Sequence, residues 1–333
     1  MPTSTQTTEA DPAGAPQPSA QAAPARAPKA VVRPGDRIFS GATLAAGILI
    51  LLTLAGVALF LLAQSSETIE AQLTDPSAIT GGNGFFAYVW PLVIGTLVSS
   101  AIALVVATPF ALGIALFTTH MAPRRLAPAL GYVIDLLAAI PSVVYGLWGL
   151  TLAGNLTGFY GWLATWFGWI PIFAPGADGA ISSTGRTLLT ASLVLSIMIL
   201  PIITSLTREI FLQTPRLQEE AALALGATRW EMIRMAVLPF GKSGIASATM
   251  LGLGRALGET MAVAMILSPG LLTASLLVSG NQTIASEIAQ NFPEAAGLRL
   301  SELISIGLVL FVITLLVNMA ARAIVAKTSV KGS

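Results

Sequence analysis

Long uninterrupted runs of apolar residues dominate the hydrophobic pattern of this chain. The first runs from residue 38 to residue 63 and contains no charged side chain. As a helix it would span about 39 Å, which exceeds the roughly 30 Å hydrocarbon core of a bilayer. A signal-peptide core is shorter, about 7–15 residues, and lies close to the N-terminus. We therefore interpret 38–63 as a retained transmembrane helix.

Five further apolar segments of helix length follow. They cover residues 91–118, 126–152, 187–206, 243–268 and 301–325. The pattern predicts an all-α polytopic membrane protein with six transmembrane helices. Prolines lie inside three of these segments, at Pro109, Pro141 and Pro201. Each should kink its helix because it removes a backbone hydrogen bond, although proline is also generally commoner in membrane helices.

The composition supports a membrane protein and removes several kinds of chemistry. The 333 residues are 54% hydrophobic and 10% charged, whereas soluble domains carry about 25% charged residues. The net charge of +1 gives no nucleic-acid signal. The chain has no cysteine, which excludes disulfides and thiolate metal sites. Its single histidine, His120, cannot build a multi-histidine metal site, and we expect it to be an interfacial residue.

The distribution of polar residues gives the domain organisation and the orientation. Residues 1–37 lack apolar periodicity and are rich in Ala, Pro, Thr and Gln, so we expect a disordered cytoplasmic tail. A transmembrane domain over 38–327, with its core at about 90–325, follows it. Fourteen of the 17 Lys and Arg residues lie in the tail, in the loops 119–125 and 207–242, and at the C-terminus. The positive-inside rule then places both termini in the cytoplasm.

A tryptophan-rich segment lies outside the six predicted spans. Residues 158–173 hold three of the six tryptophans and are interrupted by Pro171. Aromatic rings favour the headgroup zone of a membrane, so we expect an interfacial helix here. A docking surface for an outer partner is the alternative.

Two stretches imitate nucleotide-binding motifs. AVLPFGKS, at 236–243, ends like a phosphate-binding P-loop, but it begins with Ala236 and contains Pro239. GLGRALG, at 252–258, has the wrong final glycine spacing for a dinucleotide-binding turn. No strand is predicted before either stretch, so neither predicts a nucleotide site.

The inner loop 207–242 has helical periodicity instead of linker composition. Apolar residues recur at helical spacing on both sides of Gly226, at Leu217, Ala221, Leu225, Met232, Ile233 and Val237. This predicts two short helices joined at Gly226, where glycine tolerates a sharp turn. Such an element suits a cytoplasmic partner that pushes on it, or an amphipathic helix on the membrane surface.

The same loop is similar to the EAA loop of binding-protein-dependent ABC importer permeases. The matching positions are Glu220, Ala221, Ala222, Gly226, Leu238 and Pro239. Ala236 stands where the family has isoleucine, and Ile233 lies one turn earlier. The resemblance implies the type I ABC importer permease fold, with this loop docked in a groove of an ATP-hydrolysing subunit.

Two further stretches resemble the phosphate-specific permeases of that family. They are AAIPSVVYGLWGL at 138–150 and GLGRALGETMAVAMIL at 252–267, whose ending favours the PstC-type subunit over its PstA-type partner. The resemblance implies a pore-forming subunit without catalytic residues, cofactor or metal. It also implies a second, PstA-type permease, a pair of ATP-binding subunits and an extracytoplasmic phosphate-binding protein in the same membrane assembly.

Two full charges lie within the predicted span 243–268. A charge at the centre of a membrane helix costs about 2.5–3.5 kcal/mol on insertion scales, so Arg255 and Glu259 should face the bundle interior. On a helical wheel they share a face with the small residues Ala248, Gly252, Gly258 and Ala262. Their i,i+4 spacing permits an ion pair, which is either structural or part of translocation.

Arginine suits phosphate because its planar fork donates two parallel, charge-assisted hydrogen bonds. Glu259 would hold Arg255 while phosphate is absent, or select the protonated substrate. Asp135 lies at a comparable predicted depth and either faces the same cavity or bonds a neighbouring helix. Because one arginine against two carboxylates is a poor anion site, further donors should come from the partner permease.

Two other functions fit parts of this pattern. The substrate could be another oxyanion, sulfate or molybdate. The chain could also be an ion-coupled secondary carrier in which Arg255, Glu259 and Asp135 form a proton relay. Dependence of uptake on ATP separates an importer from a secondary carrier.

Overall fold

The structure of the protein is a computed structural model. It describes the backbone of residues 34–123, 125–176, 179–270 and 273–329, and the side chains of these residues except 34, 36 and 324–329. The chain divides into two compact units, Met1–Leu54 and Ala55–Ser333. Residues 1–33 of the predicted tail lie outside the described residues, and residues 34–37 form the beginning of helix α1 (Pro34–Gln64).

The described part of the first unit is the greater part of α1. Its described side chains are all exposed, and they are apolar around the whole circumference of the helix. A helix satisfies its backbone hydrogen bonds internally and can therefore face lipid on every side. This segment accounts for the first span that the hydrophobic pattern predicts.

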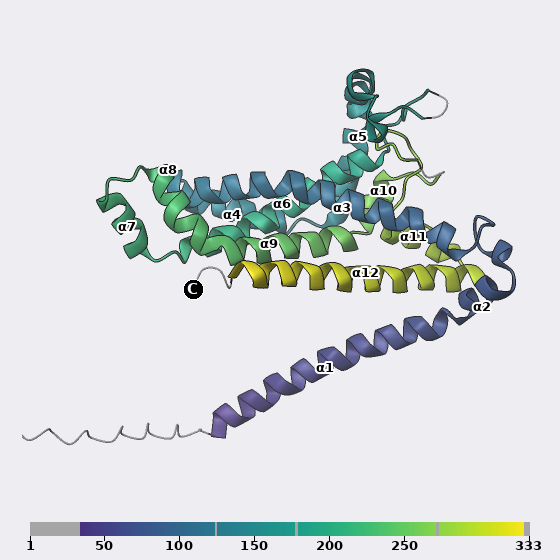
Figure 1. The fold of residues 1–333 in the computed structure, drawn as a ribbon, viewed down its shortest axis with the longest axis horizontal. Helices are drawn as coiled ribbons and strands as arrows, with labels where there is room; N and C mark the ends of the chain where they lie inside the picture. The colour runs from purple at the N-terminus through teal and green to yellow at the C-terminus, as the bar shows by residue number, and fades with distance from the viewer. Residues whose placement is uncertain (1–33, 124, 177–178, 271–272, 330–333) are drawn as a thin grey trace, which may run out of the picture. The chain divides into compact units, whose positions relative to one another are not determined.

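The second unit is a helical bundle in which α3, α6, α9 and α12 pack side by side (Figure 1). The longer helices are α3 (Phe85–Leu116), α4 (Ala127–Ala138), α5 (Ser142–Phe167), α6 (Leu188–Leu212), α9 (Leu238–Gly258) and α12 (Leu298–Ser329). The shorter ones are α2 (Ser66–Thr74), η1 (Pro76–Ala78), η2 (Phe117–Met121), η3 (Pro171–Phe173), α7 (Arg216–Ala224), α8 (Arg229–Met232), η4 (Ile233–Val237), α10 (Met261–Ile266), α11 (Ile284–Asn291) and η5 (Phe292–Glu294). The predicted all-α class is confirmed, because the described residues form no strand beyond one isolated bridge.

The number of spans differs from the predicted six. In the described part of the chain, four helical stretches are long and apolar enough to cross a membrane: Arg37–Thr74, Phe85–Met121, Leu188–Leu212 and Leu298–Ala323. The pair α4 and α5 counts as a fifth only if its 89° bend lies within one span. That bend occurs at Pro141, which has no N–H to continue the α4 hydrogen-bond ladder. The remaining segment, 243–268, is broken into α9 and α10.

Helix α6 forms the centre of the bundle. It packs along α3, where Ala103, Ala107, Ala111 and Ala115 are spaced four residues apart and are completely buried. Residues at this spacing lie on one face of a helix, and their small side chains permit a close approach. This contact between α3 and α6 forms the central part of the hydrophobic core of the unit.

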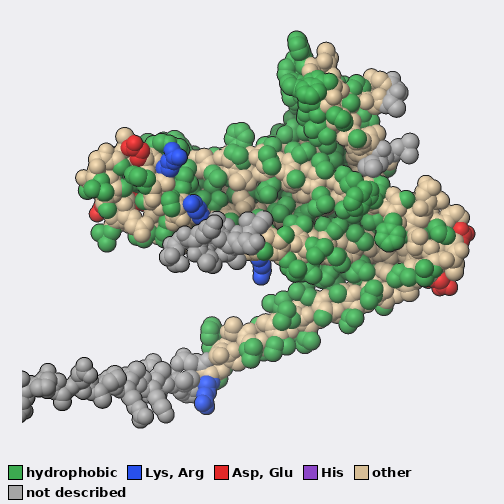
Figure 2. Space-filling model, in the orientation of Figure 1, with side chains coloured by type: hydrophobic (Ala, Val, Ile, Leu, Met, Phe, Trp, Pro, Cys, Tyr) green, Lys and Arg blue, Asp and Glu red, His purple; other side chains and the backbone are tan. Residues whose placement is uncertain are grey.

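The two ends of the bundle carry different elements. Helices α7 and α8 lie at one end, and α2 and α11 lie at the other (Figure 1). In Figure 2 hydrophobic side chains cover the body of this unit, and acidic side chains appear at its two ends. This is the arrangement expected of a body embedded in lipid with both ends in water.

Candidate functional site

The segment that carries Arg255 and Glu259 is not one continuous helix. Helix α9 ends at Gly258, Glu259 is extended with φ −69° and ψ 123°, and α10 begins at Met261. The Ala262 N–H donates to Glu259 Oε1 at 3.2 Å, whereas in a continuous helix it would bond the Gly258 carbonyl. The prediction of an unbroken helix over 243–268 is therefore wrong, and the Glu259 carboxylate caps α10 instead.

The break also removes the predicted helical pairing of Arg255 with Glu259. Arg255 lies in the last turn of α9 and is partly exposed, and Glu259 is buried. None of the ion pairs among the described residues joins the two side chains. The i,i+4 geometry needs both residues on one helix, and α9 ends before it reaches Glu259. The Tyr145 hydroxyl of α5 is within electrostatic reach of Arg255.

Asp135 lies on α4 and is exposed in this chain. Among the described residues it has no ion-pair partner within 4.0 Å. The structure thus does not join Asp135, Arg255 and Glu259 in one ion-pair network within the chain. A common cavity for Asp135 and Arg255 stays a prediction.

The small-residue face of α9 packs closely on α6. A Cβ atom added to Gly252 would lie 2.7 Å from Ile203, and one added to Gly244 would lie 2.6 Å from Ile210. Ala248, one turn before Gly252, is buried. Of the two arrangements that such a face permits, close packing or a cavity, α9 has close packing at these positions.

The predicted pair of short helices in the 207–242 loop is confirmed as α7 and α8. Gly226 lies between them with φ +87°, a conformation that side chains resist. A capping box starts α8, in which the Thr228 N–H donates to Glu231 and the Glu231 N–H donates to the Thr228 hydroxyl. The Thr228 hydroxyl also donates to the Glu231 carboxylate, and the two hydrogen bonds that this carboxylate accepts from Thr228 lower its pKa.

The loop continues into the bundle without interruption. The π-helical segment η4 follows α8, and α9 begins at Leu238 with Pro239 in its first turn, a position where proline's missing N–H costs nothing. Ile233 is buried with Phe211 of α6 and Leu116 of α3. A movement of α8 therefore reaches α9 through directly bonded and packed residues.

The outer surface of this loop is apolar and exposed. Leu225 is 90% exposed and Leu217 is 79% exposed, and Leu223 and Trp230 are also exposed. Of the matched motif residues, Glu220 and Ala221 are exposed. Ala222 packs against the buried cluster that contains Ile233, Phe211 and Leu116. Apolar side chains clustered on one exposed element mark an interaction surface.

His120 contacts the loop, which sequence reasoning did not find. Its Nε2 atom lies 3.4 Å from Glu219 Oε1 of α7, and its Nδ1 atom lies 2.6 Å from the Thr119 hydroxyl. His120 belongs to η2, the π-helical end of α3. Besides the connection through η4 to α9, the loop therefore has a direct contact between α7 and the end of α3. The two residues are 99 positions apart, so no local sequence pattern indicates their contact.

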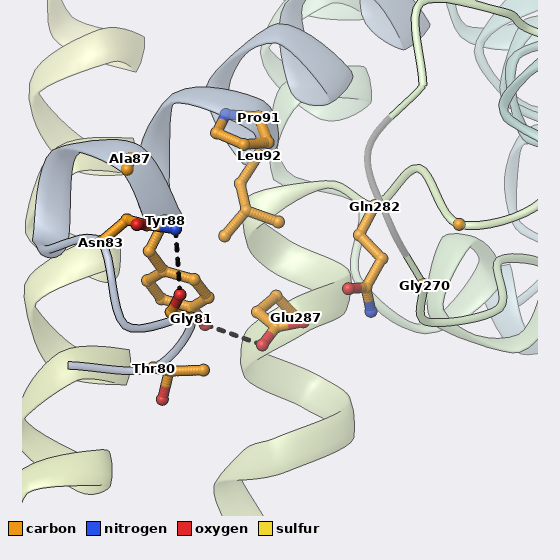
Figure 3. Close-up of a pocket in the computed structure, with 11 residues that line it drawn as sticks. Thr80, Gly81, Asn83, Ala87, Tyr88, Pro91, Leu92, Gly270, Gln282 and Glu287 are labelled. Atoms are coloured by element: carbon orange, nitrogen blue, oxygen red, sulfur yellow. Dashed lines mark hydrogen bonds between the residues drawn. The ribbon is translucent and has the colours of Figure 1, made fainter. Parts of the chain in front are cut away.

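Two buried carboxylates bind a partly exposed arginine at the opposite end of the bundle. Arg299 Nη2 lies 2.6 Å from Glu287 of α11, and Arg299 Nη1 lies 3.0 Å from Glu302 of α12. Arg299 also donates to the Tyr88 hydroxyl of α3 at 2.9 Å, and this hydroxyl donates to Glu287 at 2.7 Å. Tyr88 and Glu287 line a pocket of about 300 Å³ (Figure 3). The network joins three helices at this end.

The tryptophan-rich segment is not a separate helix. Residues 158–167 continue α5, and only residues 171–173 form a distinct turn, η3. The expectation of an independent helix over 158–173 is wrong because Gly158 and Gly161 do not interrupt α5. Trp162 and Trp166 are exposed on this continuation, and Trp169 is exposed just beyond its end. Its contact with the headgroup zone or with an outer partner stays a prediction.

The comparison with protein families agrees with these elements. Residues 107–330 match the family described as "Binding-protein-dependent transport system inner membrane component". The chain belongs to this family. It is accordingly a multi-pass membrane permease, and the match includes the whole 207–242 loop, α9 and Arg255.

Two curated relatives of this permease resemble it over most of their lengths. The first is "Phosphate transport system permease protein PstC 2" of Mycobacterium tuberculosis, 46% identical over 303 residues that cover 88% of this chain and 92% of the relative. The second is "Phosphate transport system permease protein PstC" of Mycobacterium leprae, 42% identical, with 90% of this chain and 96% of the relative covered. Both are permeases by name, and both similarities extend across the bundle.

Solved structures support the fold of the permease. The crystal structure of a bacterial ABC transporter involved in the import of the acidic polysaccharide alginate has a chain with a TM-score of 0.53 and 17% identity. The similarity covers 87% of this chain and 99% of the other. The predicted importer permease fold is confirmed by this likeness together with the family.

Proposed function

We propose that the chain is the pore-forming, PstC-type permease subunit of an ATP-driven ABC importer that takes inorganic phosphate into the cell. The observation that carries this proposal is the continuity of the coupling loop (207–242) with α9. The loop presents an apolar surface outside the bundle and leads through η4 into the helix that carries Arg255. The names of the relatives support phosphate as the substrate.

The exposed coupling loop needs a partner with a complementary apolar groove. An ATP-binding subunit dimer supplies it and hydrolyses ATP, so this chain has no catalytic residues of its own. A PstA-type permease completes the pore, and an extracytoplasmic phosphate-binding protein delivers the anion at the end that carries α2 and α11. Both termini and the coupling loop are cytoplasmic, as the distribution of Lys and Arg favours.

Arg255 is the phosphate-contacting residue in this proposal. Within the described chain no carboxylate lies within 4.0 Å of its guanidinium. A guanidinium that is not neutralised can donate two parallel hydrogen bonds to a phosphate. Glu259 supports the site by capping α10 next to Arg255. Asp135 is exposed in this chain and lies on the pathway or against the second permease, which contributes further donors.

Uptake into proteoliposomes that contain the complete importer tests the function. We expect phosphate uptake to require ATP hydrolysis and to stop when the ATPase partner is inactivated. Excess phosphate should compete with labelled phosphate, and excess sulfate or molybdate should not. Uptake that follows a proton gradient without ATP would establish a secondary carrier, and competition by sulfate would establish another oxyanion as substrate.

Substitution of Arg255 tests the site in the same vesicles. We expect Arg255→Gln to lower uptake about tenfold to a hundredfold, since hydrogen bonds to charged groups contribute about 1.5–3 kcal/mol. Arg255→Lys keeps the charge and should retain more uptake, and Glu259→Gln should lower uptake by weakening the α10 cap. Arg37→Gln replaces an exposed arginine outside the coupling loop and is the matched control. Normal uptake by assembled Arg255→Gln importer would exclude a direct role in passage.

A further inference from the structure

Arg186 binds the carboxyl end of α10. Its Nε atom donates to the Ile266 carbonyl at 3.1 Å, and its Nη2 atom donates to the carbonyls of Leu267 at 2.9 Å and Met265 at 3.3 Å. The last carbonyls of a helix have no partner within the helix, and a cation is favourable beside them. One guanidinium therefore satisfies three consecutive carbonyls and ends α10.

The position of Arg186 is itself fixed by buried contacts. Gly185 has φ +68°, and an added Cβ atom would lie 1.9 Å from the Ala153 carbonyl oxygen of α5, so only glycine fits. The Gly185 carbonyl accepts from the Thr190 hydroxyl of α6, which is also hydrogen-bonded to the Tyr160 hydroxyl of α5 at 2.7 Å. Arg186 is thus held where α5 meets the start of α6.

Two further elements hold α10 on its other sides. Gly146 of α5 lies so close to α10 that an added Cβ atom would be 2.9 Å from Ala262 Cα. Gln290 of α11 donates to the Ala264 carbonyl at 2.7 Å. Helix α10 is therefore bonded or packed to α5, α11 and the start of α6.

Helix α9 has different neighbours. It follows directly from η4 and packs on α6 through small residues such as Gly252, and on α3 and α12. At the break, the Ala262 N–H is satisfied by the Glu259 side chain instead of a carbonyl of α9. A rotation at Glu259 and Thr260 therefore sacrifices none of the hydrogen bonds that Arg186 and Gln290 make.

We propose that Arg186 is a positioning residue of the transport cycle. It holds α10 in place, and Glu259–Thr260 is then the pivot at which α9 moves when the coupling loop moves. This inference rests on the proposed function, because it takes the coupling loop to drive α9. Arg186 acts through α10 and does not contact the transported anion.

Distances between spin labels in the complete importer test the pivot. The chain contains no cysteine, so introduced cysteines carry the only labels on it. A reference label at Ile172 is paired with one at Leu251 of α9 or with one at Met261 of α10, and all three side chains are exposed. Between the nucleotide-free and ATP-trapped states we expect the 172–251 distance to change by about 2 Å or more. The 172–261 distance should stay constant.

The same measurement on Arg186 variants tests the positioning role. In Arg186→Gln we expect the distribution of the 172–261 distance to broaden. Its mean should change between the two states together with the 172–251 distance. The ATP hydrolysed per phosphate imported should rise about threefold, the effect of losing roughly one hydrogen bond's net contribution. Arg186→Lys should lie between Arg186→Gln and wild type, and Arg37→Gln, which replaces an exposed arginine, should match wild type.

Three outcomes would overturn the inference. They are equal movement of both distances in the wild type, a constant 172–261 distance in Arg186→Gln, and an unchanged ATP-to-phosphate ratio in that variant. If Arg186→Gln does not assemble, the wild-type distances still decide whether α9 pivots. A wild-type importer that moves phosphate with α9 and α10 turning as one body overturns only the pivot. A wild-type complex that does not import phosphate overturns the proposed function.

Discussion

The two ends of the bundle are held together by different interactions. In the orientation proposed above, the inner end carries α7 and α8 and the outer end carries α2 and α11. At the outer end, partly exposed arginines bind buried carboxylates and helix carbonyls, as Arg299 does between α11 and α12 and Arg186 does at α10. At the inner end, glycines of α9 pack on α6, and the coupling loop leaves leucines exposed. Hydrogen-bonded charges fix one geometry, whereas smooth small-residue contacts allow helices to slide or rotate. In the proposed importer, the outer half is therefore the fixed frame and the inner half is the part that moves.

The largest effect is expected from a variant that removes Arg299 from its ion-pair network in the outer half. Arg299→Met leaves Glu287 and Glu302 buried without a cation, and removing one partner of a buried pair costs about 3–5 kcal/mol. We expect loss of assembled importer, measured by size-exclusion chromatography and thermal denaturation. Combining Arg299→Met with Glu287→Gln and Glu302→Gln should restore part of the stability, because no buried charge then lacks a partner. A single variant as stable as wild type would show that the network does not hold the frame.

A smaller effect is expected from the inner contact of α9 with α6. Gly252→Leu places a side chain against Ile203, and overpacking of this kind costs about 1–3 kcal/mol. We expect reduced uptake with ATP hydrolysis retained, because the helices are pushed apart without losing a buried charge. Gly254→Leu is the matched control, since a Cβ atom at Gly254 meets nothing within 4 Å. Equal losses in the two variants would contradict a specific α9–α6 contact.

A third prediction concerns the contact between His120 and Glu219, which joins α3 to α7 in the inner half. We expect His120→Gln or Glu219→Gln to lower phosphate-stimulated ATP hydrolysis about two- to fivefold, because a hydrogen bond contributes about 0.5–1.5 kcal/mol net. The double variant should be little worse than either single variant, since both remove the same contact. Additive losses would mean that the two residues act separately. In that case α7 would be coupled to α9 only, and not to α3 through this contact.

The smallest effect concerns the capping box of α8. The pKa of Glu231 is lowered by the hydrogen bonds from Thr228, so its stabilising contribution is present above the ordinary value of 4.5 and is lost as the pH falls below it. We expect amide hydrogen exchange in residues 228–232 to accelerate as the pH falls below 4.5, after correction for the intrinsic rate. Glu231→Gln should remove this dependence on pH. An unchanged dependence in that variant would assign it to another group.

Much of this organisation could be predicted from the sequence because it is local or periodic. The apolar runs predict the long helices, and the glycine at 226 within a helical pattern predicts the turn between α7 and α8. The bend within 126–152 agrees with the kink expected at Pro141, whereas no residue pattern in 243–268 predicts the break at Glu259. Pro141 ends α4 by lacking an N–H, and Glu259 ends α9 by bonding the next helix with its side chain.

The residues that the sequence did not single out act over long distances in the chain. Arg186 lies about 80 residues from the carbonyls that it binds, and His120 lies 99 residues from Glu219. Nothing near either residue in the sequence indicates its partner. Arg255 and Glu259 were found because a charge within an apolar segment stands out locally.

The four buried alanines of α3 restrict how this protein can vary. Their faces meet α6 over about 18 Å of helix, since twelve residues separate Ala103 from Ala115. We expect a larger side chain at any of them to push the two helices apart, because no space is left beside these alanines. Val105 lies on the far side of the helix and is exposed, so this restriction does not extend to it.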